Sequence, residues 1–215
     1  MKLYYGNLNA DQKKDASVNN VFTKYFKEFT NNPPPNFAES TEEVQQLIEL
    51  MNNIKKDNDF DEILDFTELF DIFFIEQGIP LIYERIGISP NTEDKEYLHQ
   101  ISKDIGALIM RLKEYYNRAR PYQVATYSKQ NLFPLPTFSG HSPAYPSGHA
   151  SQSLMMCKVL SFKYPSKKEE LEKIAKEIAF SRLVLGCHYP SDNKFGEYIV
   201  NQLCQKQDIK DIYFT

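Results

Sequence analysis

The fold class is decided by the stretch from Glu93 to Arg118, which reads EDKEYLHQISKDIGALIMRLKEYYNR. Its apolar residues recur every three or four positions, the spacing that gathers side chains on one face of an α-helix. These residues are Leu98, Ile101, Ile105, Leu108, Ile109 and Leu112. The alternation typical of β-strands is rare elsewhere, and the 215 residues include only 8 glycines. The sequence therefore predicts an all-α protein.

The N-terminal part of the chain carries the same spacing. It predicts a helix from Val18 to Phe29 that ends before Pro33 to Pro35, because proline cannot continue a helix. The three prolines favour an extended strap. Ser40 to Glu43 are typical capping residues and predict the start of a second helix. A third amphipathic helix is expected from Asp59 to Gln77, ending near Gly78 and Pro80.

Composition predicts a single domain that spans residues 1–215. Hydrophobic residues make up 41% of the chain and charged residues 25%, which excludes a disordered or collagen-like protein. The most apolar stretch, Ile63 to Tyr83, is interrupted by acidic residues, so no integral membrane association is expected. The net charge of -4 and the absence of a basic stripe argue against nucleic acid as a partner.

The start of the chain and the cysteines bear on the compartment. The opening MKLYYGNLNADQKK has no apolar segment behind its lysine, so a cytoplasmic location is expected, although a trimmed periplasmic or secreted chain would read the same way. Cys157, Cys187 and Cys204 show no metal-ligand spacing and are expected to be reduced and mostly buried.

Three clusters of polar residues could carry chemistry, and the first is a pair of cations. Lys113 and Arg120 are two helical turns apart, so they share a face if the helix continues to Pro121, which is expected to end it. Cations near a helix C-terminus are common, because they interact favourably with the helix dipole. The pair alone therefore indicates little.

The second cluster is Tyr145-Pro146-Ser147-Gly148-His149, which precedes a helical pattern that runs through Leu160. Ser147 is a typical N-cap residue. A helix N-terminus offers free N–H groups to an anion, and Gly148 has no side chain to keep an oxyanion away. His149, in the first turn, could exchange a proton with a bound anion. The pattern predicts a phosphate cradle.

The third cluster follows the predicted helix from Lys167 to Gly186. Arg182 lies near the end of that helix, and His188 falls in a turn between Gly186 and Pro190. Asp192 is four residues further on and is expected to open the next helix, Asn193 to Cys204. A carboxylate so placed could hold one ring nitrogen of His188 as a donor and leave the other as a nucleophile.

Together the clusters read Lys113-x6-Arg120-Pro121, Pro146-Ser147-Gly148-His149 and Ser181-Arg182-x5-His188-x3-Asp192. This set resembles the full three-part signature of the type 2 phosphatidic acid phosphatase (PAP2) superfamily, with the signature core at residues 113–192. The run GCHYPSD at residues 186–192, and the triple proline in residues 1–90, further resemble the soluble bacterial class A non-specific acid phosphatases.

The resemblance implies an all-α domain and a metal-independent phosphatase that forms a phosphohistidine intermediate, with no cofactor and with vanadate as an inhibitor. It implies that His188 is the nucleophile, that His149 is the general acid and that Asp192 orients His188. The implied phosphate ligands are Lys113, Arg120, Ser147, Gly148 and Arg182. The substrate would be a small soluble phosphomonoester, and association into a homo-oligomer is an expectation from the resemblance alone.

The residues before the second motif, Ser139 to Ala144, differ from the class A pattern, and the loop from Tyr122 to Ala144 leaves the substrate open. Tyr122 could line the pocket or simply pack, and His141 could touch substrate or stay in an exposed loop. His99 has no evident partner and receives no role.

Two alternatives share the same residues. Vanadate-dependent haloperoxidases resemble this signature and would hold vanadate as a cofactor, but they are generally much longer. A non-catalytic phosphate- or lipid-binding module would have no use for His149, His188 and Asp192 together.

Overall fold

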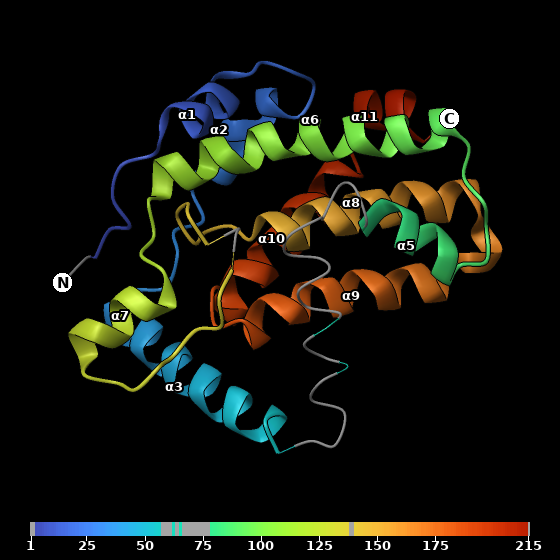
Figure 1. Cartoon of the computed structure of the whole chain (residues 1–215). Coiled ribbons are helices and arrows are strands. Elements are labelled where there is room, and N and C mark those ends of the chain that lie inside the picture. Colours follow the sequence, from blue (N-terminus) through green and yellow to red (C-terminus); the bar gives the residue numbers. More distant parts are fainter. Residues whose placement is uncertain (1–2, 57–61, 63–64, 66–77, 138–139, 215) are drawn as a thin grey trace.

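Helix α6, Thr92–Tyr116, runs across the whole molecule and organises the fold of the computed structural model (Figure 1). Asn91 caps it, since its side chain accepts the N–H of Asp94 at 2.7 Å. Asn117 ends it in the left-handed conformation, with φ 48°. The predicted helix to Arg118 is therefore confirmed over most of its length and stops two residues early.

The structure describes residues 3–56, 62, 65, 78–137 and 140–214. Over these ranges the chain is helical, with only an isolated antiparallel bridge between Tyr4 and Arg118. The predicted all-α class is confirmed. The other helices are α1 (Ala10–Ser17), a 3-10 turn (Thr23–Tyr25), α2 (Phe26–Phe29), α3 (Phe37–Ile54), α5 (Gly78–Arg85), α7 (Pro121–Ser128), α8 (Gly148–Lys163), a second 3-10 turn (Pro165–Lys167), α9 (Lys168–Val184), α10 (Pro190–Leu203) and α11 (Gln207–Tyr213).

The N-terminal predictions need correction. The helix expected at 18–29 is replaced by α1, which ends at Ser17, and by the short α2. Asn9 starts α1 through a reciprocal capping box with Gln12. Helix α3 likewise begins at Phe37 because Asn36 caps it, and Ser40 lies buried inside the helix.

Two further predictions fall between the N-terminal helices and α6. Gly78 and Pro80 lie in the first turn of α5. Most of the helix predicted at 59–77 lies outside the described residues. The three prolines form a non-helical link between α2 and α3, as expected.

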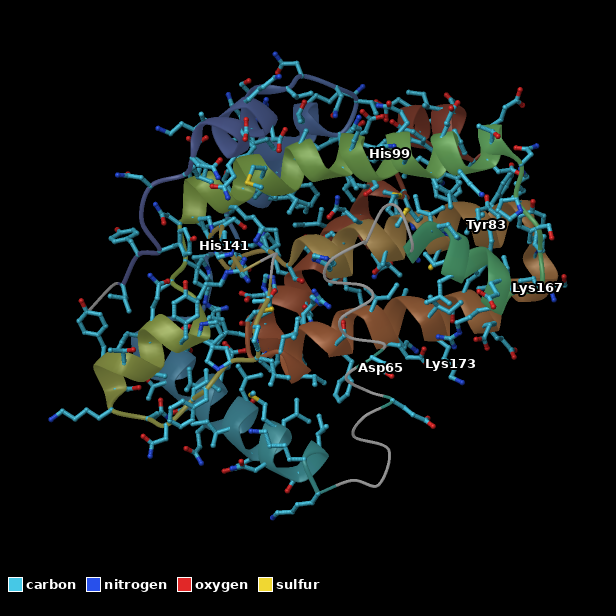
Figure 2. The ribbon with its side chains drawn as sticks, in the orientation of Figure 1. Asp65, Tyr83, His99, His141, Lys167 and Lys173 are labelled. Carbon is cyan, nitrogen blue, oxygen red and sulfur yellow. The ribbon has the colours of Figure 1, made fainter. Side chains whose placement is uncertain are left out.

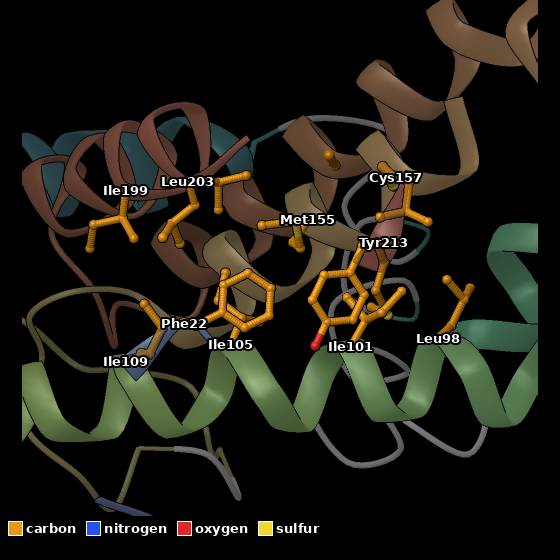
Figure 3. Packing of buried hydrophobic residues seen from close by; sticks show 14 of the residues in the cluster. Phe22, Leu98, Ile101, Ile105, Ile109, Met155, Cys157, Ile199, Leu203 and Tyr213 are labelled. Atoms are coloured by element: carbon orange, nitrogen blue, oxygen red, sulfur yellow. The ribbon is translucent and has the colours of Figure 1, made fainter. Parts of the chain in front are cut away.

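The larger hydrophobic core fills the space between α6, α8, α10 and α11 (Figure 3). Apolar side chains that α6 directs inward meet residues of the other helices there: Phe22, Leu98, Ile101, Ile105, Ile109, Met155, Cys157, Ile199, Leu203 and Tyr213. Gly196 permits α10 to approach α8, because a Cβ at this position would lie 2.6 Å from Ser151 Oγ. This close contact fixes the start of α8 against α10.

A second cluster joins α3 and α7 to the loops that precede α8 and α10. Its buried members are Val44, Leu47, Met51, Ala119, Val124, Ala125, Leu132, Ala144 and Tyr189. The three cysteines are free, and two of them are buried, in line with the sequence prediction. Within the described ranges, no helix combines the length and the apolar character needed to cross a bilayer.

Candidate active site

The three sequence clusters meet where α6 ends and where α7, α8 and α10 begin. Lys113 lies in the last turn of α6, and Arg120 is the residue that precedes α7. Pro121 thus starts a helix, so the prediction that it ends one is wrong, and the helix of Lys113 does not continue to Arg120. A chain reversal after Asn117 brings the two cations together, and the Arg120 N–H donates to Gln123 Oε1 at 2.8 Å.

A cavity of about 650 Å³ opens at this junction. Lys113, Arg120, Gly148, His149 and His188 all line it. Ser147, Arg182 and Asp192 are fully buried and lie outside its lining. The structure therefore gathers all eight predicted phosphate-binding and catalytic residues into one region, with five on the surface of the cavity.

His188 is held in a defined orientation between two groups. Its Nδ1 lies 3.0 Å from Asp192 Oδ2, and its Nε2 lies 2.9 Å from Arg120 Nη1. A carboxylate beside Nδ1 favours the tautomer in which Nδ1 carries the proton, so Nε2 keeps its lone pair. Burial lowers the pKa of His188 well below its ordinary value, and the charges of Arg120, Lys113 and Arg182 lower it further.

The cations of the site are buried to an unusual degree. Lys113 is 4% exposed, Arg120 1% and Arg182 0%. Lys113 Nζ donates to the carbonyl of Pro143, and Arg120 donates to the carbonyls of Ser142 and Cys187. Burial and the neighbouring Arg120 lower the pKa of Lys113 well below its ordinary value. Such a concentration of buried positive charge is typical of an anion site.

The first turn of α8 forms another wall of the cavity. Ser147 is its N-cap, as predicted, and donates its own N–H to the carbonyl of Asp192 at 3.1 Å. A Cβ on Gly148 would meet Gln152 Oε1 at 3.4 Å, an ordinary contact distance. Packing therefore tolerates a side chain at this position, and the bare glycine leaves its N–H open to the cavity.

The loop of His188 is tied to both neighbouring helices. Gly186 has φ 66°, so the chain turns sharply after α9. The N–H of His188 donates to the carbonyl of Arg182 at 3.3 Å. Helix α10 begins at Pro190, two residues before Asp192. The sequence predicts instead that Asp192 opens a helix that begins at Asn193. Asp192 Oδ2 accepts the N–H of Tyr189 at 2.9 Å and so caps this helix from its first turn.

The structure does not bring the two other predicted pocket residues to the cavity. Neither Tyr122 nor His141 lines it. His141 is exposed on the loop before α8, and its carbonyl accepts a hydrogen bond from Gln12 Nε2 at 2.6 Å (Figure 2). His99 on α6, which received no role from the sequence, does line the cavity. Among the described residues, no three His, Cys, Asp or Glu side chains are grouped to hold a metal ion.

Sequence reasoning missed Arg118 and Glu43. Arg118 is 5% exposed and contacts Asp192 Oδ1 at 2.6 Å and Glu43 Oε2 at 2.7 Å. Arg118 stands two residues before Arg120 in the same basic run, which is the only signal the sequence offers. Glu43 was interpreted as a helix-capping residue and gave no signal of its own.

Comparison with solved structures defines the class of fold. The chain resembles a transmembrane PAP2-type phosphatidylglycerolphosphate phosphatase from Bacillus subtilis, with a TM-score of 0.54 and 19% identity. The likeness covers 90% of this chain and 97% of that chain. It shows a shared all-α fold.

Sequence comparison then gives the family. Residues 101–199, which contain every residue of the predicted site, match the model of the PAP2 superfamily. A non-specific acid phosphatase from Salmonella typhi is 33% identical over 87 residues, or 40% of this chain. The corresponding protein from Salmonella typhimurium is 32% identical over 87 residues. The matches span 34% of the length of these relatives.

Proposed function

We propose that this chain is a metal-independent phosphomonoester hydrolase that works through a phosphohistidine intermediate. The observation that carries the proposal is the orientation of His188, whose Nδ1 lies 3.0 Å from Asp192 while the ring lines a cavity shared with two buried cations. The match to the PAP2 superfamily and the two acid phosphatase relatives support the same chemistry.

The phosphate group would bind where positive charge is concentrated. Lys113 and Arg120 face the cavity, and Arg182 adds a third positive charge from behind it. The N–H of Gly148 and the Ser147 hydroxyl would supply further hydrogen bonds to the non-bridging oxygens. Three cations neutralise a phosphate dianion, so the proposed reaction requires no divalent metal.

In the proposed chemical step, His188 Nε2 attacks phosphorus and the ester P–O bond breaks. His149, protonated at the start, gives its proton to the leaving oxygen, and Asp192 stabilises the charge on the His188 ring. A water molecule then attacks the phosphohistidine and gives a proton to His149. The N–P bond breaks, which releases orthophosphate and restores both histidines.

The substrate class we propose is a small phosphomonoester. A volume of about 650 Å³ is within the usual range for a small-molecule site and leaves room for a leaving group beside the phosphate. Orthovanadate, a mimic of the trigonal-bipyramidal transition state, is expected to inhibit.

The test is hydrolysis of p-nitrophenyl phosphate in EDTA, with His188→Ala beside the wild type. We expect wild-type turnover in EDTA and a loss of several powers of ten in the variant. Acid quenching during turnover of a ³²P-labelled ester should trap label on the wild type and not on the variant. Activity that needs added magnesium, or full activity in His188→Ala, would contradict the proposal. No turnover combined with halide oxidation by the vanadate-loaded protein would indicate a haloperoxidase.

A further inference from the structure

Asp192 is held from two sides, and only one of them belongs to His188. Oδ2 accepts from the ring of His188 and from the N–H of Tyr189. Oδ1 accepts from Arg118 Nη1 at 2.6 Å, on the opposite side of the carboxylate. Asp192 is fully buried, so its orientation depends entirely on these protein partners.

Arg118 is itself fixed by groups that have no place in the proposed reaction. Its Nη2 donates to Glu43 Oε2 at 2.7 Å and to Ser40 Oγ at 2.9 Å, both on α3. Its guanidinium lies 3.7 Å from the ring centroid of Tyr189, a close cation–π contact. The planar fork of an arginine can bridge two carboxylates in this way, whereas a lysine ammonium cannot reproduce the geometry.

Glu43 also contacts the first turn of α10, which carries Asp192. Its Oε1 accepts the N–H of Ser191 at 2.8 Å, and its Oε2 accepts the hydroxyl of Ser191 at 2.7 Å. Ser191 Oγ in turn lies 2.7 Å from Arg118 Nη1. Helix α3 is therefore joined to the first turn of α10 by a closed set of hydrogen bonds around Arg118.

The charges explain why such a bridge is needed. Burial raises the pKa of the Asp192 carboxyl, and the guanidinium of Arg118 opposes that shift. A neutral carboxylic acid would accept weakly from the Nδ1 proton of His188 and would no longer fix its tautomer. Of the groups that favour the charged form, which include the Tyr189 N–H and Arg120, Arg118 has the largest effect on the pKa, and its hydrogen bond also stops the carboxylate from rotating.

We propose that Arg118, held by Glu43, is a positioning residue that orients the Asp192 carboxylate so that His188 presents Nε2 to the substrate. The effect of Arg118 on the rate of turnover rests on the proposed function. The effect of Arg118 on the orientation of His188 rests on the geometry alone. The two can therefore be tested separately.

The test compares Arg118→Met and the conservative Arg118→Lys with the wild type. The ¹⁵N chemical shifts of the His188 ring report its tautomer without any need for activity, and His188→Ala identifies its signals among the 4 histidines. At pH 7.5 we expect the Nδ1–H tautomer in the wild type and a mixture of tautomers in Arg118→Met. Arg118→Lys should restore the charge and part of the tautomer preference.

Kinetics give the second readout. Arg118→Met should lower kcat about 10- to 100-fold, the range typical of groups that orient a functional ligand. The dissociation constant for inorganic phosphate, a ground-state ligand, should change less than threefold, because Lys113, Arg120 and Gly148 are untouched. Glu43→Gln should show the same pattern with a smaller loss, and it replaces Arg118→Met if that variant does not fold.

Arg85 supplies the matched control. It also bridges two carboxylates, Glu170 and Glu177, but it lies on α5 outside the cavity lining. Arg85→Met should lower the melting temperature and leave the His188 tautomer and kcat unchanged.

Two results would overturn the proposal. One is a wild-type tautomer in both Arg118→Met and Glu43→Gln; the other is a loss of kcat matched by an equal loss of affinity for inorganic phosphate. If the wild-type protein hydrolyses no ester, the proposed function fails, and the tautomer measurement still decides the role of Arg118.

Discussion

His188 is 4% exposed and lies among three positively charged side chains, yet its ring must be neutral to act as the nucleophile that we propose. The burial and the nearby positive charges themselves keep the ring neutral. Burial and the charges of Arg120, Lys113 and Arg182 lower the pKa of His188 well below its ordinary value of 6.5. The neutral ring therefore persists into acid solution, where an ordinary histidine would be protonated.

Lys113→Met tests this electrostatic effect. Removing one cation should raise the pKa of His188, so the acid limb of the kcat/KM profile should move to higher pH. In the wild type that limb should lie below pH 6.5, since activity falls only when His188 gains a proton. Ionisation of the substrate is common to both proteins and cancels in the comparison.

The control for this measurement is Lys95→Met, an exposed lysine in the first turn of the same helix. It should leave the acid limb where the wild type has it. An acid limb that stays in place, or moves to lower pH, in Lys113→Met would contradict the electrostatic account.

At the scale of the elements, the close contact between α8 and α10 sets the position of the predicted phosphate cradle. Two glycines at this contact, Gly196 and Gly148, have different roles. Gly196 is needed for packing, because its Cβ would lie 2.6 Å from Ser151 Oγ and 3.2 Å from the backbone oxygen of Ser147. Gly148 faces the cavity, where packing has room for a methyl group.

Gly148→Ala and Gly196→Ala should therefore separate binding from stability. Gly148→Ala should weaken orthovanadate binding about 10-fold, by crowding the anion, with the melting temperature nearly unchanged. Gly196→Ala should lower stability by about 1–3 kcal/mol, the usual cost of overpacking. Calorimetric titration and thermal unfolding measure the two effects. Loss of stability without loss of binding in Gly148→Ala would contradict this division.

The helices that form the site were predictable and the N-terminal ones were not, for a physical reason. Helices α6 and α9 bury apolar residues at regular three- and four-residue intervals, and periodicity detects such a stripe. Helix α1 buries only Ala16 and depends on the capping box of Asn9, so it carries no such signal. Helix α3 was displaced because Asn36, next to the prolines, supplies the cap that Ser40 was expected to provide.

The same limit applies to the site. Residues inside the three short motifs were found because each motif is itself a local pattern of cations, helix-capping residues or histidines in the sequence. Arg118 contacts Glu43 across 75 positions of the chain and Asp192 across 74, and no local pattern reports such contacts. His99 escaped notice because no pattern near it in the sequence marks that face of α6 as the wall of a cavity.

At the scale of the whole molecule, the cavity extends well beyond the phosphate region. Five of its residues form a stripe along α6: His99, Lys103, Gly106, Met110 and Lys113. With a rise of 1.5 Å per residue, this stripe is about 21 Å long. Asp15 and Val18, at the end of α1 and just after it, line the cavity as well. The N-terminal region thus helps to form the space that a leaving group would occupy.

The far end of this stripe should select the leaving group. Lys103 is exposed there, about 15 Å along α6 from Lys113, a separation that suits a second anionic group on an extended substrate. The carboxylate of Asp104 accepts from the hydroxyl of Tyr213 at 2.6 Å, which draws that carboxylate toward α11. An exposed charge pair contributes up to about 1 kcal/mol.

Lys103→Ala should therefore raise KM about three- to fivefold for octane-1,8-diol bisphosphate and leave kcat unchanged. Octyl phosphate, which has the same chain and no second charge, should keep its wild-type KM within twofold. Equal changes for the two esters would mean that the leaving group does not follow α6.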